Sequence, residues 1–190
     1  VITLEKNGDN FDVVIPSRSL REFTSVFSDD IETVEVFFAN NQILFRSEHI
    51  SFYTRLLEGN YPDTDRLIPT EFNTEATFNV ANLRFAMERA RLLSNATQNG
   101  TVKLEFKNGV VSSHVHSPEV GRVNEEIDTN AVSGEDLSIS FNPTYLIEAL
   151  KAIDSEQVVI RFISSVRPFT LVPEGNEQGF IQLITPVRTN

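Results

Sequence analysis

Histidines are the residues of this sequence that could most readily bind a metal ion or transfer a proton. His114 and His116 form an H-x-H pair on a predicted strand, which would place both imidazoles on one face of a sheet, where they could bind a metal. A third ligand is not evident, because the neighbouring residues are serines. Paired exposed histidines are therefore the favoured interpretation. His49 has no Ser or Asp at a spacing typical of nucleophilic catalysis.

Acidic pairs offer a second kind of chemistry. Asp29-Asp30 and Asp63-x-Asp65 could hold a divalent cation, but the chain has 27 acidic residues, so a role in turns is favoured. No phosphate-binding glycine loop and no G-x-S-x-G motif occurs, and without cysteine there is no thiolate for catalysis or for zinc. We therefore expect no catalytic residue, no metal and no cofactor, and we predict a binding or scaffold protein.

Length and charge narrow the class of protein further. The 190 residues can form one large domain or two small ones. No run of about 18 apolar residues occurs, so we expect no membrane span. The net charge of −11 argues against non-specific adhesion of the whole molecule to DNA. Because the sequence opens inside an apparent strand, Val1-Ile2-Thr3-Leu4, and without Met, we expect it to be part of a longer chain.

The elements that position these residues are repeated along the chain. Leu20, Leu83 and Leu146 lie 63 residues apart, each in a segment where a short strand runs directly into an amphipathic helix. Apolar residues at i, i+3 and i+7 place one stripe of each helix toward a core. Ser17 or Ser19 is predicted to cap the first helix. The predicted strand, helix and following strand of each copy span residues 13–17, 17–27 and 34–38, then 76–80, 81–94 and 102–106, then 139–143, 143–153 and 158–162.

Each copy therefore reads strand–helix–strand–strand–strand, and the predicted fold class is α+β with repeated β-α-β-β-β units. One unit buries only one face of its helix and sheet, so it needs a neighbour. The second and third copies, at about 73–190, can pair with each other, whereas the first copy, at about 1–68, lacks a mate. The stretch at 59–69 is rich in Gly, Pro and Asp and carries the signals of a boundary.

Positive charge concentrates on the predicted helices. They carry six bases and three acids, a net charge of +3, so the remainder of the chain carries −14. At 100° per residue, the outward-facing bases lie opposite the apolar stripes and could contact phosphates, although exposed helix faces are often simply solvated. Phe85 and Leu92 also lie on the outer side of the second helix, which is typical of an interface. The outward-facing bases are Arg18, Arg21, Arg84, Arg91 and Lys151.

Four sequence blocks resemble the bacterial sliding-clamp family, the beta subunit of DNA polymerase III. The segment from Leu57 to Pro69 resembles the family's interdomain pattern G-x-[FY]-P-[DN]-x-x-x-[LIV]-[IL]-P. Arg89-Ala90-Arg91-Leu92-Leu93-Ser94-Asn95 resembles the end of the next helix. Phe141-Asn142-Pro143-Thr144-Tyr145-Leu146 resembles F-N-x-x-Y-[LIV]. Leu183-Ile184-Thr185-Pro186-Val187-Arg188 resembles the terminal block, with Thr185 and Val187 where some relatives have Met.

The resemblance implies a DNA-clamp fold in which a complete subunit has three domains, each built from two units, and two subunits close into a ring around duplex DNA. Residues 1–72 would then be the second half of the middle domain with the interdomain linker, and residues 73–190 the C-terminal domain. It implies a non-catalytic subunit of the DNA-directed DNA polymerase holoenzyme, a processivity factor in DNA replication that is cytoplasmic and associated with the bacterial nucleoid.

The resemblance also assigns partners and sites. Double-stranded DNA would be held without sequence preference by Arg18, Arg21, Arg84, Arg91 and Lys151. Leu92 and Leu93 would form the dimer interface of the complete protein, and this chain alone is expected to be monomeric and to bind DNA barely. Peptides of the replicative polymerase, the clamp loader and repair proteins would bind a pocket between the middle and C-terminal domains, formed by Pro62, Arg66, Leu67, Asn142, Tyr145, Val166, Pro168, Leu183, Thr185, Pro186, Val187 and Arg188.

Two other functions stay open at this point. An interaction scaffold that does not act on DNA would not need basic helix faces. An acidic metal-dependent hydrolase would need a bound metal ion.

Overall fold

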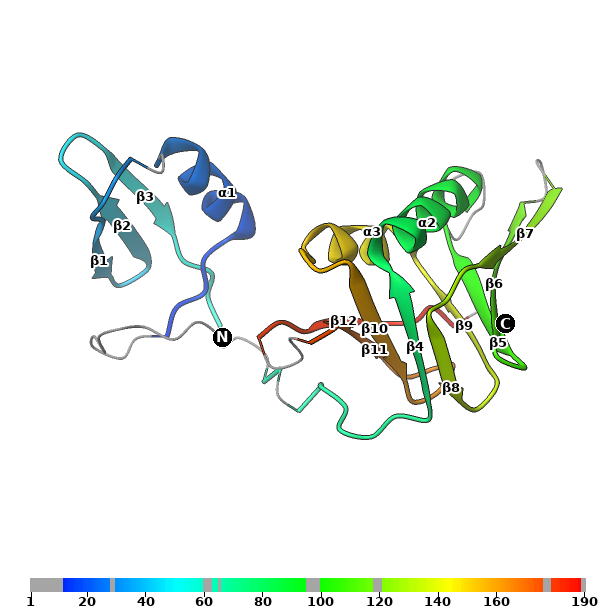
Figure 1. Ribbon diagram of the computed structural model, residues 1–190. Coiled ribbons are helices and arrows are strands. Elements are labelled where there is room, and N and C mark those ends of the chain that lie inside the picture. The colour runs from blue at the N-terminus through cyan, green and yellow to red at the C-terminus, as the bar shows by residue number, and fades with distance from the viewer. Residues whose placement is uncertain are drawn as a thin grey trace. The chain divides into compact units, whose positions relative to one another are not determined.

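The structure is a computed structural model that describes residues 12–27, 30–59, 63–64, 66–94, 100–117, 121–175 and 179–188. It divides into two compact units, one containing Leu4–Thr64 and the other Asp65–Asn190, and each is described by itself. Figure 1 shows the elements of both units along the chain. Three residues with roles considered above, Asp29, Pro62 and Asp65, lie outside the described residues.

The N-terminal unit places one helix against an antiparallel sheet. Helix α1 spans Ser17–Val26, and the sheet has the order β1-β2-β3, with β1 at Glu35–Ala39, β2 at Gln42–Arg46 and β3 at Ser51–Arg55. Phe23 of α1 packs on the sheet, with its ring centroid 4.6 Å from that of Phe45 and 6.1 Å from that of Phe52. The face of the sheet that carries Phe45 and Phe52 is therefore the core face of this unit.

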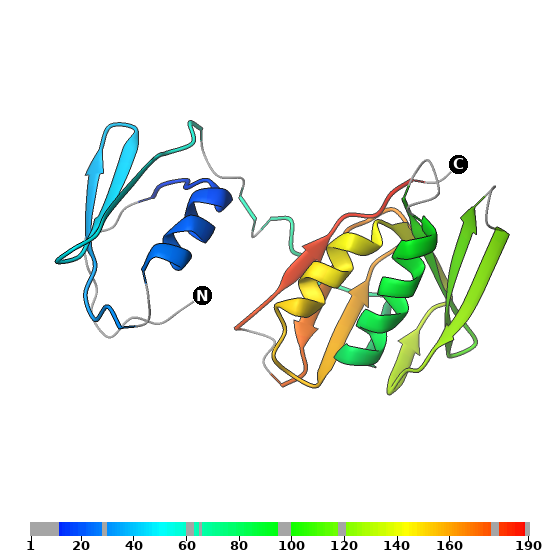
Figure 2. The same cartoon turned by 90° about the horizontal axis from the view of Figure 1, so that it is seen from above.

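The C-terminal unit combines two sheets with two helices, as far as its described residues show. Helix α2 (Val80–Ser94) and helix α3 (Pro143–Lys151) pack against each other and lie side by side over the sheets (Figure 2). One sheet has the order β12-β11-β10-β4-β8 and the other β7-β6-β5-β9. Their strands are β4 (Thr74–Asn79), β5 (Val102–Lys107), β6 (Val110–Ser117), β7 (Gly121–Ile127), β8 (Ala131–Gly134), β9 (Leu137–Phe141), β10 (Gln157–Phe162), β11 (Phe169–Pro173) and β12 (Gln182–Ile184).

The two repeats of the C-terminal unit are joined by exchanging their first strands. Strand β4 opens one repeat but pairs with β10 of the other, with Phe78 opposite Val158. Strand β9 opens the second repeat but pairs with β5 of the first, with Phe141 opposite Val102. The two pairings use equivalent positions of the repeat, so the unit has internal two-fold pseudosymmetry. Neither repeat can complete its sheet without the other.

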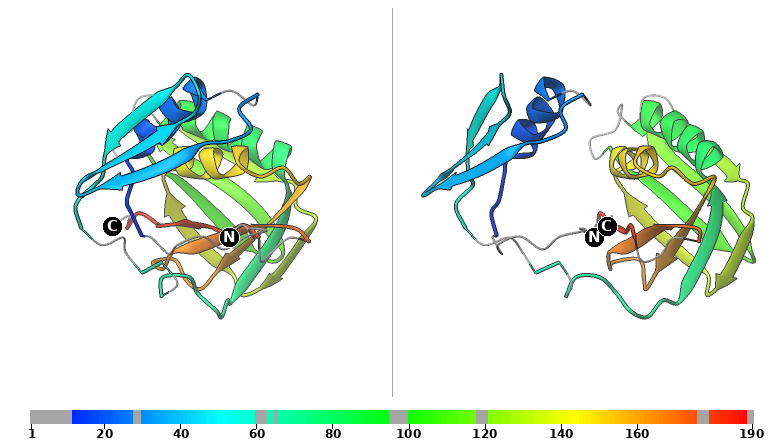
Figure 3. Two further views of the ribbon diagram at one scale, coloured as in Figure 1. Left: turned by 90° about the vertical axis from the view of Figure 1, so that its left-hand side faces the viewer. Right: turned by 60° about the vertical axis from the view of Figure 1, so that its left-hand side comes forward.

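Aromatic side chains fill the core where the two sheets face each other. Phe162 packs between Phe106 and Phe169, with ring centroids 4.9 Å and 5.1 Å away, and Phe141 lies 5.2 Å from Phe169. All four side chains are buried, and the apolar faces of α2 and α3 close the same core. Because one partner in the Phe106–Phe162 contact comes from each repeat, this core forms only when both repeats are in place (Figure 3).

The predicted α+β fold with repeated units is confirmed, and the three predicted helices form within two residues of their expected ends. Asn142 caps α3 by accepting a hydrogen bond from the Thr144 N–H at 2.9 Å. The predicted cap of α1 is wrong: Pro16 occupies that position without a side-chain bond, and Ser19 instead hydrogen-bonds Thr54 at 2.8 Å. The second repeat also carries an additional short strand, β8, which passes to the other sheet.

The predicted strand at 13–17 is also wrong, because residues 12–16 are not part of any strand and Ser17 already belongs to α1. Its two counterparts, β4 and β9, each form a ladder with the strand that follows the helix of the other repeat. The N-terminal unit contains a single repeat, so its described residues offer no such partner. No helix in the described part of the chain is long and apolar enough to cross a membrane.

Candidate peptide-binding and nucleic-acid sites

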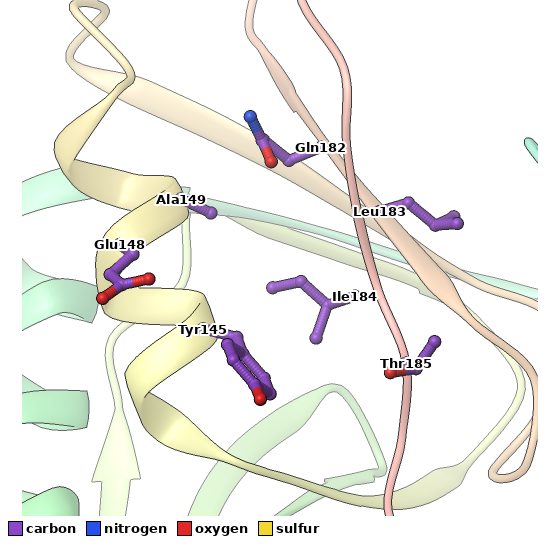
Figure 4. Close-up of a pocket in the computed structure, with 7 residues that line it drawn as sticks. All are labelled: Tyr145, Glu148, Ala149, Gln182, Leu183, Ile184 and Thr185. Atoms are coloured by element: carbon purple, nitrogen blue, oxygen red, sulfur yellow. The ribbon is translucent and has the colours of Figure 1, made fainter. Parts of the chain in front are cut away.

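A hollow of about 470 Å³ opens between helix α3 and strand β12 of the C-terminal unit (Figure 4). Ala149 and Ile184 form its apolar floor, and Ile184 turns toward the helix whereas Leu183 turns away, as alternation along a strand requires. Tyr145 stands at the edge and is 56% exposed. The remaining described residues of the lining are Glu148, Gln182 and Thr185.

Local structure holds both walls of this hollow in place. The Asn142 cap and Pro143 fix the start of α3, so Tyr145 is presented in its first turn. Strand β12 pairs with β11, with Ile184 opposite Phe169. Beyond β12, the Val187 N–H donates to the Ser140 carbonyl at 2.7 Å, which attaches the C-terminal segment to β9. The hollow is therefore a preformed feature of the fold.

The chemistry of the lining suits an apolar side chain carried on a peptide. Ile184 and Ala149 supply apolar surface, while the Tyr145 hydroxyl, the Glu148 carboxylate and the Gln182 amide can hydrogen-bond peptide groups around it. No group in this lining has a shifted pKa that would indicate a general acid or base. The arrangement favours binding over catalysis.

The structure brings together only part of the predicted pocket. Tyr145, Leu183 and Thr185 line the hollow, whereas Pro62 lies outside the described residues. Sequence reasoning missed Glu148, although it lies three residues after Tyr145 and hence on the same helix face. It also missed Ala149, Gln182 and Ile184. The predicted residues that are absent from the described lining are Arg66, Leu67, Asn142, Val166, Pro168, Pro186, Val187 and Arg188.

Basic side chains lie on the helices of both units. In the C-terminal unit, Arg84 and Arg91 of α2 are half-buried, and Lys151 is exposed in the last turn of α3. The Arg84 guanidinium lies 3.9 Å from the Glu88 carboxylate, and its Nε is buried without a hydrogen-bond partner among the described residues. Because α2 and α3 pack side by side, the three cations belong to one helical layer.

In the N-terminal unit, Arg18 and Arg21 are exposed on α1, with the Arg18 Nε 3.0 Å from the Glu22 carboxylate. This exposed ion pair contributes little to stability.

A neighbouring arginine of α2 has a structural role instead. Arg89 forms two hydrogen bonds with the Glu125 carboxylate on β7, one of them from Nε at 3.3 Å. These hydrogen bonds from Arg89 to Glu125 raise the pKa of Arg89 above its usual value. Arg89 therefore ties α2 to the sheet and is not available to a ligand in the way that Lys151 is.

The exposure of Phe85 and Leu92 that helix geometry predicts is confirmed, at 50% and 71% respectively. Leu93 behaves differently, because it is partly buried and packs against the core of its own unit. The outer face of α2 thus presents Leu92, rather than both leucines equally.

The histidine pair lies on β6, as predicted, in a polar setting. The ring nitrogens of His114 lie 2.9 Å from the Ser112 hydroxyl and 2.8 Å from the Asn124 side-chain oxygen, and its Nε2 lies 3.3 Å from Glu105. Both nitrogens therefore have polar partners within the sheet. Within the described residues, no group of three or more His, Asp or Glu side chains is arranged to hold a metal ion.

Two cross-paired repeats with paired helices on one side of their sheets, and a peptide-sized hollow beside one helix, define a clamp-type α+β repeat domain. Two family models match the chain: DNA polymerase III beta subunit, C-terminal domain, over residues 65–188, and DNA polymerase III beta subunit, central domain, over residues 2–63. The chain belongs to the DNA polymerase III beta subunit family.

Individual relatives agree with this assignment. The chain is 80% identical over 189 residues to the beta sliding clamp of Streptococcus pneumoniae serotype 4, covering 100% of this chain and 50% of that protein. A crystal structure of the DNA polymerase III beta chain from Streptococcus pneumoniae matches with a TM-score of 0.94 at 80% identity, over 99% of this chain and 50% of the other. That of the Streptococcus pyogenes beta subunit matches with a TM-score of 0.92 at 70% identity, over 99% and 51%. The chain thus spans about half the length of these relatives.

Proposed function

We propose that this chain is part of a DNA sliding clamp, a processivity factor that encircles duplex DNA and tethers the replicative polymerase. Family membership supports this proposal, and so does the contrast between basic helices and an acidic remainder of the chain. A ring retains DNA by its topology, so contacts from the helices need only be weak and independent of sequence. The residues proposed to face DNA are Arg18, Arg21, Arg84, Arg91 and Lys151.

The proposal includes the domain division and the place of action. Residues 1–72 form the second half of a middle domain with its linker, and residues 73–190 form the C-terminal domain. The contact-based division at residue 64 and the matched ranges 2–63 and 65–188 fall close to this boundary. The protein acts in the bacterial cytoplasm at the nucleoid as a non-catalytic subunit of the polymerase holoenzyme.

The two further surfaces receive proposed partners. Peptides of the replicative polymerase, the clamp loader and repair proteins bind at the hollow beside Tyr145, with the other residues of the predicted pocket contributing around it. In the complete protein, the outer face of α2 at Leu92, with Leu93 beside it, forms the ring interface. The exposure of Leu92 supports this role, since a solvent-facing leucine of 71% exposure has no packing function within its own unit.

Reversing two cations on α2 tests the DNA-encircling function. In the complete subunit, the double variant Arg84→Glu/Arg91→Glu is expected to shorten the products of processive primer extension by about tenfold, because it replaces attraction to phosphates with repulsion. The matched control is Arg122→Glu/Arg167→Glu, which makes the same charge change at exposed positions outside the helices. Equal product lengths for the double variant and the wild type would favour the scaffold that does not act on DNA.

Removing the aromatic ring of Tyr145 tests the peptide site. Tyr145→Ala is expected to weaken binding of a C-terminal peptide from the replicative polymerase by about tenfold, since an aromatic anchor at such a site is worth 1–2 kcal/mol or more. Isothermal titration calorimetry measures the affinity, and Tyr53→Ala, an exposed tyrosine in the other unit, is the control. An unchanged affinity in Tyr145→Ala would remove the hollow from the binding site.

A further inference from the structure

Equivalent leucines in the three repeats differ sharply in burial. Leu83 and Leu146 are both 0% exposed, whereas Leu20, at the same position of the first repeat, is 42% exposed. The residue type and the helix register are the same, so the difference comes from what lies opposite the helix. In the C-terminal unit, α2 and α3 pack against each other, and α1 has no second helix among the described residues of its unit.

The strand that follows the helix shows the same contrast. The β1–β2 hairpin closes at the Ala39–Gln42 pair and the β5–β6 hairpin at the Lys107–Val110 pair, which makes Phe38 the equivalent of Phe106 and Val36 the equivalent of Leu104. Phe106 and Leu104 are 2% and 0% exposed, whereas Phe38 and Val36 are 43% and 41% exposed. Val36 lies opposite Phe45, so this is the core face of the sheet.

In the C-terminal unit, the second repeat covers these positions. Strand β9 pairs with the outer edge of β5, and Phe162 packs its ring on Phe106. Phe162 is itself the equivalent of Phe106 in the other repeat, because each is the last apolar residue of the strand that follows the helix. The contact is therefore a pseudo-two-fold contact between like residues, and a single repeat carries both halves of the joint.

The backbone at 12–16 retains one half of this joint in the first repeat. Val14 accepts a hydrogen bond from the Leu57 N–H at 2.8 Å, as its equivalents Thr77 and Ser140 accept bonds from Asn130 and Val187. Strand alternation directs the backbone groups of the two residues beside Val14 to the opposite side. In the described part of the unit, no strand pairs with that side or with the outer edge of β1.

We propose that two copies of this chain associate through their first repeats and together form one clamp-type domain. The segment 13–15 of each copy pairs with β1 of the other, α1 packs along the α1 of the second copy, and the two Phe38 rings meet on the two-fold axis. The register follows from the C-terminal unit: Phe78 opposite Val158 and Phe141 opposite Val102 both translate to Ile15 opposite Val34. Such an interface is isologous and closes at two copies.

A second copy is the occupant that the structure favours, because the complementary surface is present on the chain itself. The exposed apolar face of Leu20, Val36 and Phe38 and the open edge of β1 match the elements that the same repeat supplies. The expectation of a monomer considered only the interface at Leu92 and Leu93, and this proposal replaces it. It stands independently of DNA binding.

Sedimentation equilibrium of the 190-residue chain tests the association. The wild type is expected to have twice the chain mass of 21.4 kDa at concentrations of tens of micromolar, and Phe38→Glu is expected to sediment as the 21.4 kDa monomer. Tyr53→Glu is the control, since Tyr53 lies on the opposite face of the same sheet and is 73% exposed. A monomeric wild type, or a dimer that persists in Phe38→Glu, would overturn the proposal.

A cross-linking experiment removes the dependence on a destabilising charge. The sequence has no cysteine, so Phe38→Cys introduces a unique thiol, which is expected to form a disulfide-linked dimer on mild oxidation of the otherwise unchanged chain. Tyr53→Cys and Leu92→Cys place the thiol on the opposite face of the sheet and on α2. Efficient dimer formation by Cys at position 38 alone supports the proposal, whereas formation at position 92 and not at 38 would contradict it.

Discussion

Replacing Phe162 with alanine is expected to destabilise the C-terminal unit by about 3–5 kcal/mol, the cost of removing a fully buried aromatic ring from a close-packed core. Phe162 is 0% exposed and contacts the rings of Phe106 and Phe169, so its removal leaves a cavity between the two sheets and between the two repeats. Amide hydrogen exchange along β10 measures the local free energy of unfolding in the complete chain. The expected change is an acceleration of at least about a hundredfold.

The control for this prediction is Phe85→Ala, which removes the same ring from the same unit. Phe85 is 50% exposed on the outer side of α2, with the Arg84 guanidinium 5.4 Å from its ring centre. Its loss is expected to cost about 1 kcal/mol, from partial burial and the cation–π contact. Similar effects for the two variants would show that the joint between the repeats is not the main source of stability in this unit.

Helix positions could be predicted from the sequence because helical periodicity is local. The apolar spacing around Leu83 and Leu146 identifies α2 and α3 without knowledge of their neighbours, and Asn142-Pro143 marks the start of α3. The segment 13–17 has the composition of a strand but is not one, because a ladder requires a second segment at the right distance. Strand formation here depends on the other repeat, which no local pattern in 13–17 reveals.

Burial is the property that the sequence predicts least well. Leu20 and Leu83 have the same residue type, the same register and similar helices, yet one is 42% exposed and the other fully buried. The peptide site shows the same limit. Glu148 follows from Tyr145 by helical spacing, but placing Gln182 beside α3 requires the pairing of β12 with β11, a contact between distant parts of the chain.

Gly134→Ala is expected to destabilise the C-terminal unit by about 3 kcal/mol. Gly134 ends β8 with a φ of +99°, a left-handed conformation that disfavours any residue with a Cβ. A Cβ atom there would lie 1.9 Å from the carbonyl oxygen of Asn73, which is backbone and accepts a hydrogen bond from the Glu135 N–H at 3.0 Å. Substitution therefore forces apart β8 and β4, which pair at Thr74 and Gly134.

Gly175→Ala separates this steric effect from the cost of the backbone conformation alone. Gly175 also has a positive φ, of +80°, but a Cβ atom there meets nothing within 4 Å, so its substitution is expected to cost only about 1 kcal/mol. Urea unfolding of both variants, with hydrogen exchange of the β4 amides as a local probe, gives the two values. Equal costs would mean that the Asn73 carbonyl yields to the added methyl group. A larger cost for Gly134→Ala would assign the difference to the close approach of β8 and β4, the strand pair that links the end of the second repeat to its own beginning.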